Sequence, residues 1–180
     1  MSEITLLGLP GALRRASTNR LLLREAARLF GPARYVEADL ALPLYDGDLE
    51  AAEGIPAAVE TLAGQIRAAD AVLISGPEYN KGISGVLKNA LDWISRTKGA
   101  PLAGKPVAIM SAAAGRAGGE RTQVMLRSCL YPFRPRLLQG PEVLLAASSE
   151  AFDDEGRLLG DSYVEGVTAL MQALREEIAR

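Results

Sequence analysis

Histidine is absent from this 180-residue sequence, and the one cysteine is Cys129. A chain without histidine cannot build a Ser-His-Asp or Cys-His catalytic site, and a single thiolate does not make a zinc site. One cysteine also excludes an internal disulfide and a CxxC redox pair, so we expect a reducing, cytoplasmic location. We therefore predict no metal site and no catalytic side chain, and expect any catalysis to depend on a bound cofactor, on carboxylates or on electrostatics.

Long apolar runs and an excess of one charge are missing as well. No segment approaches the roughly 20 apolar residues that cross a bilayer, and the N-terminus lacks a signal-peptide pattern. The formal net charge is −2, without a long run of either sign, so nothing supports a nucleic-acid or membrane partner. Apolar residues make up 48% of the chain and charged residues 23%, as in globular proteins. We expect one domain over residues 1–180.

Short apolar runs alternate with helical patterns along the chain. Residues 70–76 are nearly all apolar, which is typical of a parallel strand buried on both faces. Strands joined to helices by short loops predict an α/β fold with a doubly wound parallel sheet. We predict strands at 4–9, 34–38, 70–76, 106–110 and 143–146, helices at 20–30, 56–68, 82–97, 118–130 and 161–178, and a polar loop at 42–55.

Polar and basic side chains follow the first predicted strand. The loop 10–19 carries Arg14, the hydroxyls of Ser17 and Thr18, and the amide of Asn19. Together with the free N–H groups of a helix start, these groups can bind a phosphate. The loop is neither a G-x-G-x-x-G loop nor a P-loop, because the required glycine spacing is absent. A phosphate site and a simple helix cap are equally consistent with this pattern.

Two further loops are expected beside this one, because ligands of doubly wound sheets bind at the carboxyl ends of the strands. In the loop 76–82, Tyr79 and Asn80 suit a planar heteroaromatic ligand, and a solvated turn is the alternative. The loop 111–119 has small residues, which let another molecule approach the backbone, and Arg116, which suits a phosphate of a pyridine nucleotide. We expect Trp93 on a buried helix face or at a subunit contact.

The segment 77–93, PEYNKGISGVLKNALDW, resembles the NADPH-dependent FMN reductase family, which includes bacterial chromate, quinone and azo-dye reductases. Segments 11–19, 42–46 and 152–158 support the resemblance, which extends in collinear order over nearly the whole chain. It implies a flavodoxin-like three-layer fold, with a five-stranded parallel sheet of order 2-1-3-4-5 and helices on both faces. It also implies FMN as cofactor, NADPH or NADH as hydride donor, a small-molecule electron acceptor, and a homodimer or homotetramer.

The resemblance also implies roles for particular residues. The FMN phosphate is expected on the first loop and the isoalloxazine ring between the second and third loops. The sequence departs from the family at Ala12, where a serine is common, and at Pro132 and Pro135, which should end the preceding helix early. The expected cofactor-binding residues are Arg14, Ser17, Thr18 and Asn19 for the phosphate, and Pro77, Glu78, Tyr79, Asn80, Ser111, Ala114 and Gly115 for the ring.

We therefore predict an FMN-dependent NAD(P)H oxidoreductase that transfers hydride through flavin N5 to a quinone, free flavin, chromate or azo compound. A flavodoxin-type electron carrier without its own NAD(P)H oxidation is the alternative, although such carriers are typically strongly acidic. A phospho-receiver module is a third possibility, but it needs acidic residues after the first strand, where residues 9–11 have none. Arg14, Arg15 and Arg116 favour NADPH over NADH.

Overall fold

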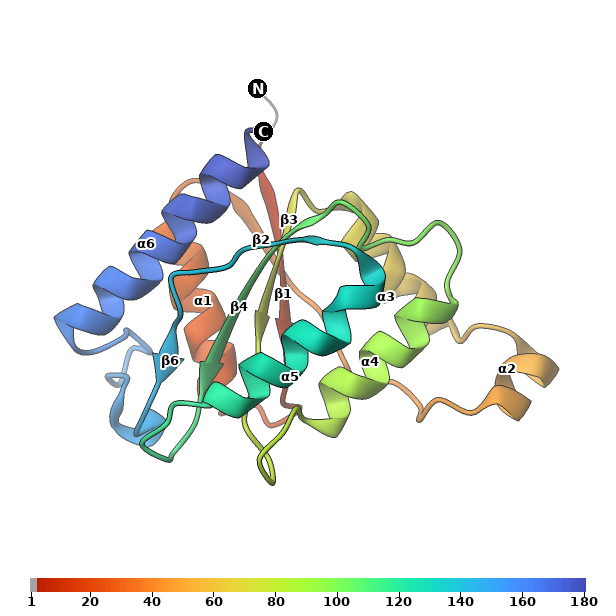
Figure 1. The fold of residues 1–180 in the computed structure, drawn as a ribbon, viewed down its shortest axis with the longest axis horizontal. Helices are drawn as coiled ribbons and strands as arrows, with labels where there is room; N and C mark the ends of the chain where they lie inside the picture. Colours follow the sequence, from red (N-terminus) through yellow and green to blue (C-terminus); the bar gives the residue numbers. More distant parts are fainter. Residues whose placement is uncertain (1–2) are drawn as a thin grey trace.

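The computed structural model describes residues 3–180 and is built on a parallel β-sheet (Figure 1). Its strands follow the order β2-β1-β3-β4-β5, and β6 pairs with the carboxyl end of β4, beyond β5. The predicted order 2-1-3-4-5 is therefore confirmed, with the fifth position shared by two short strands. The strands are β1 (Thr5–Pro10), β2 (Arg34–Glu37), β3 (Ala71–Ser75), β4 (Pro106–Ala112), β5 (Arg136–Leu137) and β6 (Leu144–Leu145).

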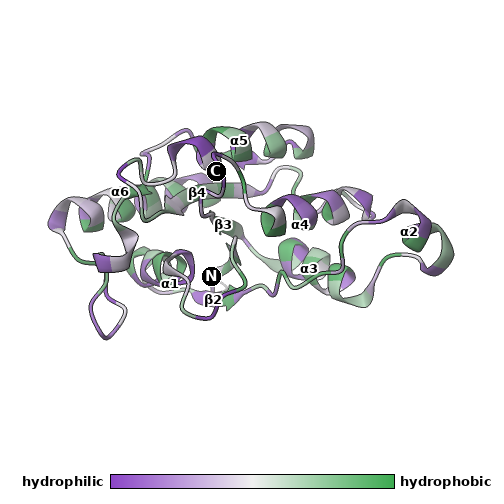
Figure 2. Cartoon of the chain, turned by 90° about the horizontal axis from the view of Figure 1, so that it is seen from below, coloured by the Kyte–Doolittle hydropathy of each residue, from purple (hydrophilic) through white to green (hydrophobic). Residues whose placement is uncertain are grey.

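Helices cover both faces of the sheet, as the view onto its edge in Figure 2 shows. Helices α1 (Thr18–Phe30) and α6 (Asp161–Ile178) pack on one face, and α3 (Ala57–Ala68), α4 (Gly85–Arg96) and α5 (Glu120–Leu130) pack on the other. Two single turns of 3-10 helix, η1 (Tyr131–Phe133) and η2 (Ser148–Glu150), follow α5 and β6. No helix within residues 3–180 is long and apolar enough to cross a membrane.

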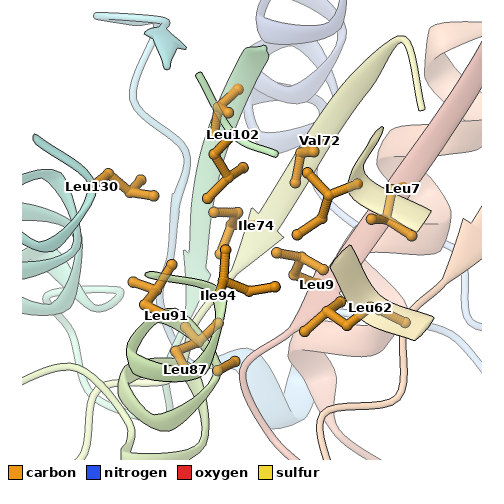
Figure 3. Packing of buried hydrophobic residues seen from close by; sticks show 14 of the residues in the cluster. Leu7, Leu9, Leu62, Val72, Ile74, Leu87, Leu91, Ile94, Leu102 and Leu130 are labelled. Carbon is orange, nitrogen blue, oxygen red and sulfur yellow. The ribbon is translucent and has the colours of Figure 1, made fainter. Parts of the chain in front are cut away.

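Side chains along each strand alternate between these two faces. Leu7 of β1 and Ile74 of β3 face α3 and α4, whereas Leu6 and Leu73 on the same strands face α1 and α6. Figure 3 shows the first of these clusters, in which leucine and isoleucine side chains of the helices close over the sheet. Because both faces are buried, polar groups that meet a ligand are confined to the ends of the strands.

The prediction of a loop over 42–55 is wrong in part, because the segment contains the short helix α2 (Gly47–Glu53). Asp46 starts this helix by accepting a hydrogen bond from the Asp48 N–H at 2.9 Å. The helix buries no residue, so the sequence contains no apolar periodicity that could have revealed it. The buried Trp93 indole holds the segment against α4 by donating to the Pro43 carbonyl at 2.8 Å, so Trp93 does lie on a buried helix face.

Other predicted boundaries also shift. The helix predicted from residue 82 begins at Gly85, because Ser84 accepts the Leu87 N–H at 3.3 Å and caps it. The strand predicted at 143–146 is shorter, and β5 was not predicted, because two residues carry no periodic pattern. Helix α5 ends at Leu130 and η1 follows, which confirms the early end expected from Pro132.

The carboxylate of Glu25 ties α1 to the segment before α6. Glu25 is 3% exposed and accepts hydrogen bonds from Arg28, from Arg157 at 3.2 Å and from the Leu158 N–H at 3.3 Å. Burial by itself raises the pKa of this carboxyl, but the hydrogen bonds from Arg28, Leu158 and Arg157 outweigh it, so the pKa is lowered from its ordinary value. Folding therefore favours the ionised form.

A lowered pKa predicts a stabilisation that is present above the unfolded pKa and lost as the pH falls through the folded pKa. Glu25→Gln should reduce the free energy of unfolding by about 2 kcal/mol at pH 7, because the arginines and the Leu158 N–H lose their charged acceptor. The difference from the unmodified protein should shrink below about pH 5. Urea unfolding at several pH values measures it, with the exposed Glu165→Gln on α6 as control. A difference that stays constant down to pH 3 would contradict this account.

Candidate functional site

A cavity of about 350 Å³ opens at the carboxyl edge of the sheet. Its walls come from the loops that follow β1, β3, β4 and β6, so segments far apart in the sequence meet there. Eight of the residues predicted for a cofactor site line it: Arg14, Ser17, Thr18, Asn19, Pro77, Glu78, Tyr79 and Ala114. Four further lining residues were not predicted: Ala12, Ala112, Ala113 and Ser148.

The start of α1 presents hydrogen-bond donors to this cavity. Ser17 occupies the N-cap position with extended backbone (φ −73°, ψ 127°), but its side chain accepts no helix N–H. Within residues 3–180, the backbone N–H groups of Thr18 and Asn19 have no acceptor. Arg14 is exposed and donates to the carbonyl of Ala16 at 2.9 Å. The cap interpretation of this loop therefore fails for the Ser17 side chain, and the free donors form an anion-binding arrangement.

Asn19 differs from its neighbours because its side chain is buried and bound within the protein. Its amide nitrogen donates to the Ala112 carbonyl at 2.9 Å. Its amide oxygen accepts from the Ala112 N–H at 3.0 Å and from the Ser75 hydroxyl at 2.8 Å. The side chain thereby connects α1 to the last residues of β3 and β4.

The loop after β3 is a tight turn that carries Tyr79. The backbones of Tyr79 and Gly82 exchange two hydrogen bonds of 3.1 Å, and Asn80 and Lys81 between them have φ values of 50° and 69°. Positive φ at both central residues is the pattern of a type I′ turn, which asparagine tolerates well. Tyr79 is 56% exposed at the cavity mouth, whereas Asn80 does not line the cavity.

Glu78, beside this turn, accepts a hydrogen bond from the backbone N–H of Arg121 at 3.1 Å. Arg121 lies in the first turn of α5, so the carboxylate satisfies one of the free donors at that helix start. The loop after β3 is thereby fastened to α5, and the wall of the cavity that contains Pro77 and Tyr79 is held in place.

The loop after β4 contributes backbone and methyl groups, because Ala112, Ala113 and Ala114 line the cavity. Ser111 is fully buried, and its hydroxyl donates to the Gly118 carbonyl at 2.7 Å and accepts from the Gln123 amide at 3.0 Å. Neither Ser111 nor Gly115 lines the cavity, so the structure does not bring these two predicted residues into the site.

Ser148 is the polar lining residue that the sequence prediction missed. It lies at the start of η2, after β6, and its hydroxyl is 3.1 Å from the Thr18 hydroxyl, which donates to it. Its backbone N–H donates to the Ala113 carbonyl at 3.1 Å. The position of Ser148 directly after a predicted parallel strand was a signal, because that is where ligands of such sheets bind.

The lining groups suit a ligand with an anionic end and a flat end. The start of α1 supplies N–H groups, hydroxyls and a guanidinium, which are donors for a phosphate. The alanines at the end of β4 and in the loop after it line the cavity with small side chains, and Pro77 and Tyr79 offer apolar faces. Within residues 3–180 no cluster of three histidine, cysteine, aspartate or glutamate side chains could hold a metal ion. A phosphorylated flavin therefore fits the residues present.

Known proteins are similar to this chain in sequence and in fold. The sequence profile of the family described as NADPH-dependent FMN reductase matches residues 4–150. An NAD(P)H-dependent FMN reductase of Pseudomonas aeruginosa is 45% identical over 99% of this chain and 97% of its own length. A quinone reductase of Escherichia coli is 38% identical over 100% of this chain and 98% of its own.

Among solved structures, FerB of Paracoccus denitrificans, a flavoenzyme NAD(P)H:(acceptor) oxidoreductase, aligns with a TM-score of 0.87 at 28% identity. The alignment covers 98% of this chain and 97% of FerB. An archaeal flavodoxin aligns with a TM-score of 0.62 at 8% identity over 98% of this chain and 99% of its own, which shows the flavodoxin-like fold alone. The chain therefore belongs to the NADPH-dependent FMN reductase family, which confirms the predicted oxidoreductase function, the FMN cofactor and the NAD(P)H donor.

Proposed function

We propose that this protein oxidises NADPH or NADH and reduces a small acceptor, such as a quinone, free flavin, chromate or an azo compound, with FMN held in the carboxyl-edge cavity. The observation that supports this most is that the backbone N–H groups of Thr18 and Asn19, two residues that line the cavity, have no acceptor within residues 3–180. FMN held by these residues would supply the hydride and electron chemistry, while the protein supplies its binding and position.

The start of α1 is the phosphate end of the proposed site. The N–H groups of Thr18 and Asn19, the Ser17 hydroxyl and the Arg14 guanidinium provide direct donors. The sequence lacks a hydroxyl at Ala12, and the loop after β6 brings the Ser148 hydroxyl to Thr18 instead. Because a typical hydrogen bond contributes about 1 kcal/mol, one hydroxyl more or less changes FMN affinity without deciding whether FMN binds.

The loops after β3 and β4 form the ring end. Pro77, Glu78 and Tyr79 line the cavity from the loop after β3, and Ala112 to Ala114 line it from the end of β4 and the loop that follows, with Asn80, Ser111 and Gly115 in the adjoining turns and strand end. Tyr79 is more than half exposed, so solvent reaches the mouth where donor and acceptor must enter in turn. Water can therefore protonate the reduced acceptor, and no side chain is assigned that role.

The whole chain is proposed to act as one FMN-binding domain over residues 1–180, located in the cytoplasm. We propose further that it forms a homodimer or homotetramer. Val124 on α5 and Tyr131 in η1 are about two turns apart and are both exposed. Tyr131 also lines a groove of about 590 Å³, together with Leu130 and Pro132. Exposed apolar residues next to a groove favour a contact between subunits.

Activity is tested with purified protein loaded with FMN under nitrogen. Addition of NADPH is expected to bleach the flavin absorbance bands, and a quinone added afterwards should restore them. NADH in place of NADPH, and ferricyanide or oxygen in place of the quinone, map the choice of donor and acceptor. Bound FMN that stays oxidised with both NADPH and NADH would contradict the proposed function and leave the electron-carrier alternative.

The phosphate end is tested by Arg14→Ala, which removes a charge expected to bind the phosphate. FMN affinity, measured from quenching of flavin fluorescence, should fall by about 10- to 100-fold, because a hydrogen bond to a charged group contributes about 1.5–3 kcal/mol. Affinity for riboflavin, which lacks the phosphate, should not change. Arg15→Ala is the matched control, since Arg15 is also exposed and does not line the cavity. An equal loss in both variants would show only a general effect of charge.

Assembly is tested by sedimentation velocity. The unmodified protein is expected to sediment as a dimer or tetramer, and Val124→Glu should shift it toward the monomer by placing a charge in the contact. Leu159→Glu is the matched control, because Leu159 is also an exposed apolar residue but precedes α6. A protein that is monomeric at all concentrations without any substitution would contradict the proposed assembly.

A further inference from the structure

Asn19 stands at the point where α1 meets the ends of β3 and β4. Its side chain is 2% exposed, and it makes three hydrogen bonds to Ala112 and Ser75. An asparagine amide has two N–H donors and an oxygen with two lone pairs. Both lone pairs and one donor are therefore used within the protein, which leaves little of the amide for a ligand.

The hydrogen bonds between Asn19 and Ala112 take the place of strand pairing, because β3 and β4 no longer pair at Ala112. The last registered pair of β3 and β4 is Ser75 with Met110, and the chain then leaves the sheet at Gly76. The next residue, Pro77, has no N–H to donate. On the other side of β4, Ala112 stands beside Leu145 in register, but the donors on this side are the N–H groups of Ser111 and Ala113, which bind the carbonyls of Val143 and Leu145. The N–H and carbonyl of Ala112 would therefore be buried without partners if the Asn19 amide did not bind both.

We propose that Asn19 is a positioning residue whose amide fixes the ring end of the cavity relative to its phosphate end. The inference rests on the proposed FMN site. The amide binds both backbone groups of Ala112 and thereby fixes the loop 112–114, while its own backbone N–H belongs to the start of α1. Ser75 completes the link by holding the amide oxygen from β3. The distance between the phosphate end and the ring end of the site is thereby fixed, because one side chain of α1 is hydrogen-bonded to the ends of both β3 and β4.

This role differs from direct binding of the phosphate by the Asn19 amide, and riboflavin distinguishes the two. A direct phosphate contact affects FMN alone, whereas a displaced loop 112–114 also weakens a ligand that has the ring but no phosphate. Asn19→Ala is expected to weaken FMN and riboflavin alike, by about tenfold, because more than one buried hydrogen bond is lost.

Ser75→Ala tests whether the effect passes through the network. Ser75 does not line the cavity, and its hydroxyl donates to the Asn19 amide oxygen. Ser75→Ala should weaken the binding of both ligands by about fivefold, since one neutral hydrogen bond is lost. In the Asn19→Ala background it should have no further effect, because residues of one hydrogen-bond network are not additive.

Asn19→Asp adds a pH readout. An ionised aspartate cannot donate to the Ala112 carbonyl, but a protonated one can, and burial raises the pKa of such a carboxyl. Riboflavin binding by Asn19→Asp should therefore improve as the pH is lowered from 8 to about 5.5. The dissociation constant of Asn19→Asp divided by that of Asn19→Ala should fall over this range. The ionisable groups around the cavity, Arg14 and Glu78 among its lining residues, are common to both variants, and riboflavin has no phosphate to titrate.

The outcomes separate the proposals. If the unmodified protein binds neither FMN nor riboflavin, the proposed function fails. If it binds both and Asn19→Ala weakens only FMN, or if Ser75→Ala and Asn19→Ala are additive, the positioning role is overturned while the FMN site stands. Melting temperatures of the ligand-free variants show which of them fold. If Asn19→Ala does not fold, the effect of Ser75→Ala on riboflavin decides, and an unchanged affinity overturns the inference.

Discussion

Burial of a parallel sheet on both faces is the constraint on which the rest of this molecule depends. The central strands must be largely apolar on both sides, as Leu6 and Leu7 are on β1, so the interior of these strands has no room for groups that bind a polar ligand. Such groups can stand only where strands end and helices begin. Because all strands are parallel, those ends lie at one edge, and the loops after β1, β3, β4 and β6 form one cavity there.

The same constraint leaves some backbone N–H and carbonyl groups without strand partners, and side chains bind them instead. Neighbouring strands diverge where their loops begin, and backbone groups near the divergence stay buried without strand partners. Asn19 binds those of Ala112, and Glu78 binds an N–H of a different kind, the free donor of Arg121 in the first turn of α5. Residues that would be taken for ligand contacts because of their position therefore also hold the walls of the cavity together. A chain without histidine can be an oxidoreductase in this way, since the cofactor supplies the redox chemistry and the protein supplies its position.

Much of the fold could be predicted from the sequence, because long apolar patterns report burial directly. The strands at β1, β3 and β4 and the helices α1, α3 and α6 were expected within a few residues of their observed bounds. Short elements were missed for a physical reason. Helix α2 buries no side chain and β5 has two residues, so neither carries a periodic pattern, whereas the strand expected at 143–146 is found as the shorter β6. The contacts that hold such short elements come from distant parts of the chain. An example is the hydrogen bond from the Trp93 indole to the Pro43 carbonyl, which holds the segment that contains α2.

The sequence by itself determined the class of fold, the family and the chemistry that is excluded, because residue types and their order suffice for each. The absence of histidine and the run from Pro77 to Trp93 are properties of the chain before it folds. Only the tertiary structure decided which polar groups face the cavity. Ser111 turns into the interior, Ser148 arrives from the last loop, and the Asn19 amide is bound by Ala112 and Ser75. Those outcomes depend on how strands far apart in the sequence are placed beside one another, and local pattern carries no information about that placement.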